Sequence, residues 1–127
     1  MCFHPHFRGI AVLAALLLLA ATGGARAAEL VMFESQTCDW CRRFHAEITP
    51  IYPKTAEAAC APLRRVDVNA PRPRDLGGIK SILFTPTFVV VDGGREVGRL
   101  TGYPGDDFFW PKIGAELRKL GDACRLP

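Results

Sequence analysis

Cys38-Asp39-Trp40-Cys41 is the stretch that decides the fold, because it lies between a short apolar run and a helical pattern. Leu30-Val31-Met32-Phe33 precedes it and predicts a buried strand that ends in a polar turn. Beyond it, side chains that would share one face of a helix recur at spacings of three and four: Cys41, Phe44, His45 and Ile48. The sequence therefore places two cysteines, separated by two residues, where a strand gives way to a helix.

Two cysteines in this position can exchange disulfides. At the start of a helix, unpaired backbone N–H groups and the positive end of the helix dipole favour the thiolate of Cys38, which is the nucleophilic form. Cys41 follows within the first turn and can resolve a mixed disulfide formed on Cys38. Arg42 and Arg43 add positive charge nearby and Asp39 opposes it, so the sign of their net effect on the pKa of Cys38 stays open.

Other uses of the cysteine pair are weighed against this one. With His45 it has the Cys-x2-Cys-x3-His spacing of a partial zinc site, but no fourth ligand stands at a useful spacing. A purely structural disulfide is a second alternative, although a disulfide that closes only a two-residue loop at the start of a helix is an uncommon structural cross-link. A c-type haem requires His directly after the second cysteine, where Arg42 stands. We therefore expect a redox-active pair, with no metal and no cofactor.

The rest of the pattern predicts an α/β fold. Pro50 and Pro53 should break the first helix, which resumes over residues 54–60. Further strands are predicted at 63–68, 88–91 and 95–101, a turn at 92–94 and a weak helix at 75–82. Asp106 or Asp107 should cap a last helix with a buried stripe of Trp110, Ile113, Leu117 and Leu120. The expected architecture is a mixed central sheet with helices on both faces and 88–91 as its central strand.

The first 27 residues are predicted to be a cleaved signal peptide, which sets them apart from a single domain at 28–127. Arg8 precedes an apolar run from Ile10 to Ala21, and Ala25-Arg26-Ala27 matches the small-residue pattern of a cleavage site. The run is shorter than the roughly 20 residues that span a bilayer, so an uncleaved anchor is the lesser alternative. We therefore expect an exported protein.

Charge and cysteine count constrain the partners. Beyond residue 27, Lys and Arg number 14 against 13 Asp and Glu, and four cysteines remain: Cys38, Cys41, Cys60 and Cys124. The net charge beyond residue 27 is therefore close to zero, and this part of the sequence has no cluster of basic residues like that of a nucleic-acid binder. We therefore expect no nucleic acid partner. In an oxidising compartment an even count favours pairing, but the count does not choose among the three connectivities.

Thr85-Pro86-Thr87 stands directly before the predicted central strand. A proline there is costly in a sheet unless its peptide geometry is used, and an X-Pro bond is where a cis peptide costs least. Together with the Cys-x-x-Cys at a helix start, this tripeptide resembles the thioredoxin superfamily over about residues 30–120. The resemblance implies a thioredoxin fold in which a cis-proline, Pro86, faces the two cysteines.

The same resemblance implies roles for residues around the cysteines. The Thr85 backbone would pair with an extended client segment, and Pro86 would shield the sulfurs from stray metal. Trp40 and Tyr103 would offer apolar surface to a partner, or else be ordinary residues of the rim.

A narrower resemblance is to the SoxS-type periplasmic thioredoxins of bacterial sulfur oxidation. It rests on three stretches: Phe84-Thr-Pro-Thr-Phe88, Asp92-Gly-Gly-Arg-Glu-Val-Gly-Arg99 and Gly102-Tyr-Pro-Gly-Asp-Asp-Phe-Phe-Trp110. It implies a periplasmic reductant of disulfides on client proteins, with a sulfur-carrier protein as one client and a membrane thiol-electron transporter as the electron source. The alternatives are a disulfide oxidase or isomerase, and a non-catalytic thiol- or metal-binding module.

The chain also departs from cytoplasmic thioredoxins. Its dipeptide is Asp39-Trp40 in place of Gly-Pro, and Met32 stands where they have a buried acid, six residues before the first cysteine. Proton transfer from Cys41 therefore lacks its usual base. Glu34 is a candidate to replace that acid, and its alternative is a solvent-facing turn residue.

The remaining two cysteines are expected to pair. In the implied topology the helix that ends at Cys60 and the helix before Cys124 finish on the same face, at the same end of the sheet. We therefore expect a Cys60–Cys124 disulfide, which stabilises the fold by about 4 kcal/mol in the chain-entropy account. Two unpaired thiols are the alternative.

Overall fold

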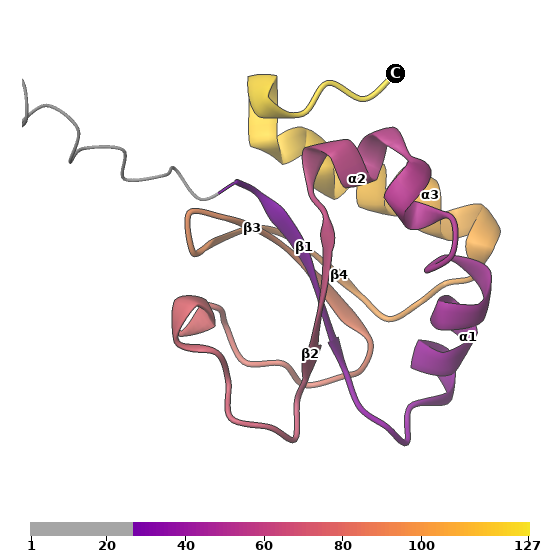
Figure 1. Cartoon of the computed structure of the whole chain (residues 1–127), viewed down its shortest axis with the longest axis vertical. Coiled ribbons are helices and arrows are strands. Elements are labelled where there is room, and N and C mark those ends of the chain that lie inside the picture. Colours follow the sequence, from indigo (N-terminus) through magenta and orange to yellow (C-terminus); the bar gives the residue numbers. More distant parts are fainter. Residues whose placement is uncertain (1–26) are drawn as a thin grey trace, which may run out of the picture.

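A four-stranded mixed sheet forms the centre of the computed structural model, which describes residues 27–127 (Figure 1). The predicted signal peptide, residues 1–27, lies outside the described residues except for Ala27. Strands and α-helices follow in the order β1 Glu29–Glu34, α1 Asp39–Glu47, α2 Ala56–Cys60, β2 Leu63–Asp67, β3 Thr87–Asp92, β4 Arg95–Thr101 and α3 Asp106–Leu117. Three 3-10 helices are interspersed among residues 27–127: η1 Tyr52–Lys54, η2 Arg74–Leu76 and η3 Arg118–Ala123.

The strand order is β2-β1-β3-β4, with β1 and β2 parallel and the other neighbours antiparallel. The run Thr87-Phe88-Val89-Val90-Val91 is buried throughout, as expected for the central strand β3. Gly93 and Gly94 close the β3–β4 turn. Both have positive φ, a backbone conformation that a residue with a side chain adopts with difficulty. The predicted strands and their mixed pairing are therefore confirmed.

All three α-helices pack on one face of the sheet, so of the helices expected on both faces only the 3-10 helix η2 lies on the other. Leu30 and Met32 of β1 and Phe88 of β3 point to this face, where they meet side chains of α1, η1 and α3 in one apolar cluster. Its centre is aromatic: the Phe44 ring lies 4.7 Å from that of Phe88 and 5.2 Å from that of Phe109. Packing of α1 against β1 and β3 therefore fixes the helix that has Cys38 as its N-cap residue and Cys41 in its first turn.

The other face is covered by the segment between β2 and β3, drawn in pink and salmon on the far side of the sheet from α1 (Figure 1). Leu76 and Ile79 of this segment pack on Val31 and Val89. The prediction of a helix at 75–82 is wrong, because only the single 3-10 turn η2 forms in this segment. Two consecutive glycines, Gly77-Gly78, lose the most backbone entropy on folding and end the turn there.

The ends of the helices differ in detail from the prediction. As expected, α1 stops before Pro50, and the chain resumes as α2 only after η1, capped by the Thr55 hydroxyl. The cap predicted for α3 is wrong: Gly105 occupies that position with φ 94°, and Asp106 and Asp107 lie in the first turn instead. Acidic residues there still favour the helix, because they face its positive end. No helix within residues 27–127 is long and apolar enough to cross a membrane.

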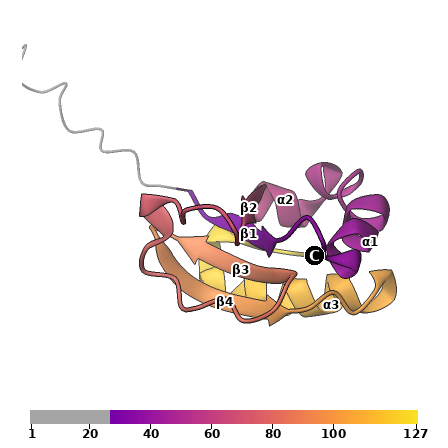
Figure 2. The same cartoon turned by 90° about the horizontal axis from the view of Figure 1, so that it is seen from below.

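A disulfide joins Cys60, at the end of α2, to Cys124, after η3. The two residues are 64 apart in sequence, and their Cα atoms are 5.0 Å apart. Both views show the described chain beginning at the end of the sheet opposite α1 (Figure 1, Figure 2). The bond ties the C-terminal segment to α2 on the helical face.

Replacing Gly98 with alanine is expected to destabilise the fold by about 1–3 kcal/mol, because α3 crosses β4 closely at this point. An added Cβ would lie 2.5 Å from Oε2 of Glu116 and 3.2 Å from its backbone oxygen. Urea unfolding of Gly98→Ala measures the loss. Gly78→Ala is the matched control, since its Cβ would meet only an ordinary contact at 3.5 Å, and it should show no loss. Equal stability of the two variants would contradict this packing.

Candidate active site

Cys38 and Cys41 form a disulfide at the start of α1. Cys38 is the N-cap residue with extended backbone, and its Sγ accepts a hydrogen bond of 3.0 Å from the backbone N–H of Cys41. Cys38 keeps the larger exposed fraction, 8 % against 2 % for Cys41. Cys38 is therefore the more accessible residue of the pair, and Cys41 lies deeper.

The charges that flank the cysteines largely cancel. Asp39 and Arg42 form an ion pair on the exposed side of the first turn. Arg42 also donates to the backbone oxygen of Gln36. Because the ion pair neutralises both side chains, the N-terminal N–H groups of α1 remain as the positive potential at Cys38.

The Thr85–Pro86 peptide bond is cis. The β1–β3 register places Thr87 opposite Phe33, so Pro86 lies at the end of β1 that leads into Cys38. Pro86 is buried, and its carbonyl accepts a 2.7 Å hydrogen bond from the backbone N–H of Gly102. Thr85 is half-buried, and its backbone makes no hydrogen bond to another residue within 27–127. It can therefore pair with a chain from outside.

Large apolar side chains are exposed in the two segments that enter the site. Trp40 lies between the cysteines and is 53 % exposed. Leu83 and Phe84, directly before Thr85-Pro86, are 80 % and 67 % exposed. Sequence reasoning missed these two, although an apolar pair next to the predicted cis-proline was the available signal.

Tyr103 neither adds to this apolar surface nor lies on the rim, which were the two alternatives expected for it. Its ring is 5 % exposed and packs edge-on against Phe44 at 5.4 Å. Its hydroxyl donates to Glu47 at 2.5 Å, and the same carboxylate accepts from Arg43 at 2.8 Å. The Arg43 guanidinium in turn lies over the Trp40 ring at 5.5 Å, so the buried tyrosine anchors a chain of contacts that orients the exposed tryptophan.

The series of contacts from Tyr103 through Glu47 and Arg43 to Trp40 stays intact near neutral pH. Arg43, followed by Tyr103, lowers the pKa of the Glu47 carboxyl by hydrogen bonding. Burial, followed by the bond to Glu47, raises the pKa of the Tyr103 phenol. Glu47 therefore stays ionised and Tyr103 stays protonated across the range in which thiols react.

A surface pocket of about 250 Å³ adjoins Cys41 on the side of β2. Its lining includes Glu34 at the end of β1 and His45 on α1, which contact each other through Oε2 and Nε2. His45 is thus engaged with Glu34 and Thr49 and is not directed at a metal with the cysteines. Within residues 27–127, no three His, Cys, Asp or Glu side chains gather as a metal-binding group.

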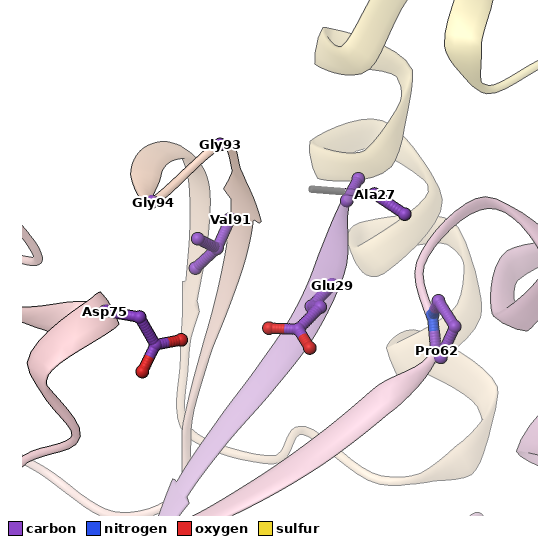
Figure 3. A pocket seen from close by; sticks show the side chains of 8 residues that line it. Ala27, Glu29, Pro62, Asp75, Val91, Gly93 and Gly94 are labelled. Atoms are coloured by element: carbon purple, nitrogen blue, oxygen red, sulfur yellow. The ribbon is translucent and has the colours of Figure 1, made fainter. Parts of the chain in front are cut away.

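A second pocket, of about 190 Å³, lies at the opposite end of the sheet and contains no cysteine (Figure 3). Glu29 and Asp75 project toward it, and Gly93 and Gly94 form part of its wall (Figure 3). Both carboxylates bind the Arg64 guanidinium, at 3.2 and 2.6 Å. This arrangement is structural, so the chemistry belongs to the cysteine end.

Comparison with known proteins agrees with this site. The chain is similar to the periplasmic thioredoxin SoxS from Paracoccus pantotrophus, whose reduced form has been crystallised: 44 % identity, a TM-score of 0.70, and coverage of 73 % of this chain and 98 % of SoxS. The X-ray structure of Fasciola hepatica thioredoxin matches at 24 % identity and a TM-score of 0.53, over 71 % of this chain and 81 % of that one, which supports the fold. No protein-family model and no curated protein matches the chain.

The chain belongs to the thioredoxin superfamily. It is a thiol-disulfide oxidoreductase, with Cys38–Cys41 as its Cys-x-x-Cys pair. Within the superfamily it resembles SoxS, the periplasmic thioredoxin named above.

Proposed function

We propose that the protein is a periplasmic reductant of disulfides on other proteins. The observation that carries the proposal is the similarity to a periplasmic thioredoxin over nearly that protein's whole length, with Cys38 and Cys41 at the start of α1. The signal peptide predicted at 1–27 supports export. In this role the reduced pair donates two electrons to a client and ends as the Cys38–Cys41 disulfide.

The reaction proceeds in two exchanges. The Cys38 thiolate attacks one sulfur of the client disulfide, a mixed disulfide forms, and the other client sulfur leaves as a thiolate. Cys41 then loses its proton and attacks Sγ of Cys38, which forms the Cys38–Cys41 bond and releases the second client sulfur. The client is reduced and the protein is oxidised by the same two electrons.

The client segment binds in extended form beside Thr85. The unpaired Thr85 backbone supplies strand-like hydrogen bonds, in the manner of a peptide added to a sheet edge. Trp40, Leu83 and Phe84 supply apolar contact on either side. This surface favours an unfolded or loop segment around the client sulfur over a deeply buried disulfide.

A sulfur-carrier protein of sulfur oxidation is the client that the likeness to SoxS suggests. Electrons would then come from a membrane protein that transfers thiol reducing equivalents across the inner membrane. The electron donor follows from the proposed compartment, because a periplasmic protein has no direct contact with the cytosolic thiol pool.

The redox state of the protein in its own cells tests the proposal. The periplasmic fraction is acid-quenched, free thiols are alkylated, and the intact mass is measured. We expect a chain that begins at Ala28, with Cys38 and Cys41 alkylated and Cys60 and Cys124 protected. A chain retained whole in the cytosol would contradict the location, and a periplasmic chain held fully oxidised would contradict the direction of electron flow. Cys38→Ser is the control that assigns the labelled positions.

A further inference from the structure

The pocket beside Cys41 contains a closely bonded acid and imidazole that the exchange steps above do not use. Cys41 and His45 are four residues apart on α1, so both point to the same side of the helix, one turn from each other. Glu34 enters from the end of β1 and lines the same pocket. The resolving thiol, a carboxylate and an imidazole therefore face one shared, solvent-sized space.

Met32, six residues before Cys38, is fully buried in the apolar cluster that contains Cys38 and Cys41, and none of the described residues in this cluster is an acid. Apart from the cysteine, the pocket beside Cys41 is lined by five ionisable groups: Glu34, His45, Asp67, Arg42 and Arg65. The two arginines cannot accept a proton. Asp67 lies on β2 and accepts from the backbone N–H of Asn69, whereas Glu34 and His45 contact each other and His45 lies one turn from Cys41 on α1. The Glu34–His45 pair is therefore the acceptor that the helix places beside the thiol.

Besides contacting each other, Glu34 and His45 each have a further hydrogen-bond partner. Arg65 donates from Nε to Oε1 of Glu34 at 2.8 Å, and Oε2 of Glu34 contacts Nε2 of His45. Nδ1 of His45 lies 2.7 Å from the Thr49 hydroxyl. The Glu34 side chain is only 14 % exposed and that of His45 22 %, so Glu34 is not a solvent-facing turn residue.

The arrangement accepts a proton without losing a hydrogen bond. With neutral His45, Nε2–H donates to Glu34, and Nδ1 accepts from the Thr49 hydroxyl. After uptake of a proton, Nδ1–H donates to the same hydroxyl, which rotates to accept it. The imidazolium is then paired with the Glu34 carboxylate, whose other oxygen still binds Arg65.

We propose that the Glu34–His45 pair is the proton acceptor for Cys41 in the resolving step. The Cys41 S–H proton passes through pocket solvent to the pair, and the resulting Cys41 thiolate attacks Sγ of Cys38. The Cys38–Cys41 bond forms, the bond from Cys38 to the client sulfur breaks, and that sulfur leaves with the electron pair. The inference rests on the reductive direction proposed above.

Single-turnover kinetics separate the two steps. The protein, with Cys38–Cys41 reduced and Cys60–Cys124 left oxidised, is mixed with the symmetric aromatic disulfide of nitrothiobenzoate, which releases one coloured thiolate per step. The first release depends on probe concentration and reports attack by Cys38. The second does not, and reports attack by Cys41. Its leaving thiolate needs no proton, so the rate depends on deprotonation of Cys41 and its attack on Cys38 but not on protonation of the leaving group.

We expect Glu34→Gln and His45→Gln to slow the second release at least about tenfold at pH 7, toward the hundredfold typical of a lost general base. The first release stays within about twofold. The deficit shrinks as the pH rises past about 8.5, the pKa of an ordinary thiol, because solvent then deprotonates Cys41 unaided. Glu57→Gln, an acid-to-amide change on α2 outside the pocket, is the matched control and leaves both phases unchanged.

Two results would overturn the inference: second releases at wild-type rate in both variants, or a deficit of equal size at every pH, which a purely structural role produces. Failure of the wild-type protein to give the first release would instead overturn the proposed function. The two failures are therefore distinguishable in one experiment.

Discussion

Cys38→Ser is expected to lower disulfide turnover by at least about a thousandfold, because a serine hydroxyl is not ionised near neutral pH and forms no disulfide. Cys38 is the more exposed residue of the pair and the one that lies at the N-cap of α1. Insulin reduction or the nitrothiobenzoate assay measures the loss.

Cys41→Ser is the matched control for that result. It should still release one equivalent of nitrothiobenzoate, since Cys38 remains able to attack, and then stop as a mixed disulfide. A Cys38→Ser protein that kept this first release would show that Cys41 is the entry sulfur and would reverse the roles assigned here.

Joint replacement of Cys60 and Cys124 by alanine is expected to lower the free energy of unfolding by about 4 kcal/mol, because the bond closes a long loop in the unfolded chain. For a domain of this size that corresponds to a fall in Tm of roughly 15 °C or more. Urea unfolding and thermal melting measure both quantities.

The reduction potential of Cys38–Cys41 should stay unchanged in the same double variant, since the second disulfide joins α2 to the C-terminal segment and not to the start of α1. A loss of stability without a change in potential separates the two disulfides by role. Unchanged stability would mean that the Cys60–Cys124 bond contributes nothing to the fold.

The strands and the first helix could be predicted because their signals are local. Three local signals each specify one element without help from distant residues: the buried run 87–91, the glycine turn after it, and the spacing of Cys41, Phe44 and Ile48. The helix expected at 75–82 does not form, because a local signal there pointed to the wrong structure. Leu76 and Ile79 have helical spacing and are buried, but Gly77-Gly78 between them makes a loop the cheaper way to bury both.

The parts of the site that sequence reasoning missed depend on contacts between distant segments. Tyr103 was expected at the surface, but it is buried against Phe44 and bonded to Glu47, which lies 56 residues earlier in the chain. Glu34 had two interpretations, a replacement for the missing acid or a solvent-facing turn residue. Only its pairing with His45 and Arg65 across the strand edge excludes the second. Neither contact follows from the spacing of residues along the chain.

The reduction potential of the Cys38–Cys41 couple tests the central claim most directly, by equilibration of the mature domain with glutathione or dithiothreitol. The account predicts a value near or below about −230 mV, in the range of reducing thioredoxin-type proteins. A value near about −120 mV would make the protein an oxidant of client thiols and would contradict the proposed direction of electron flow.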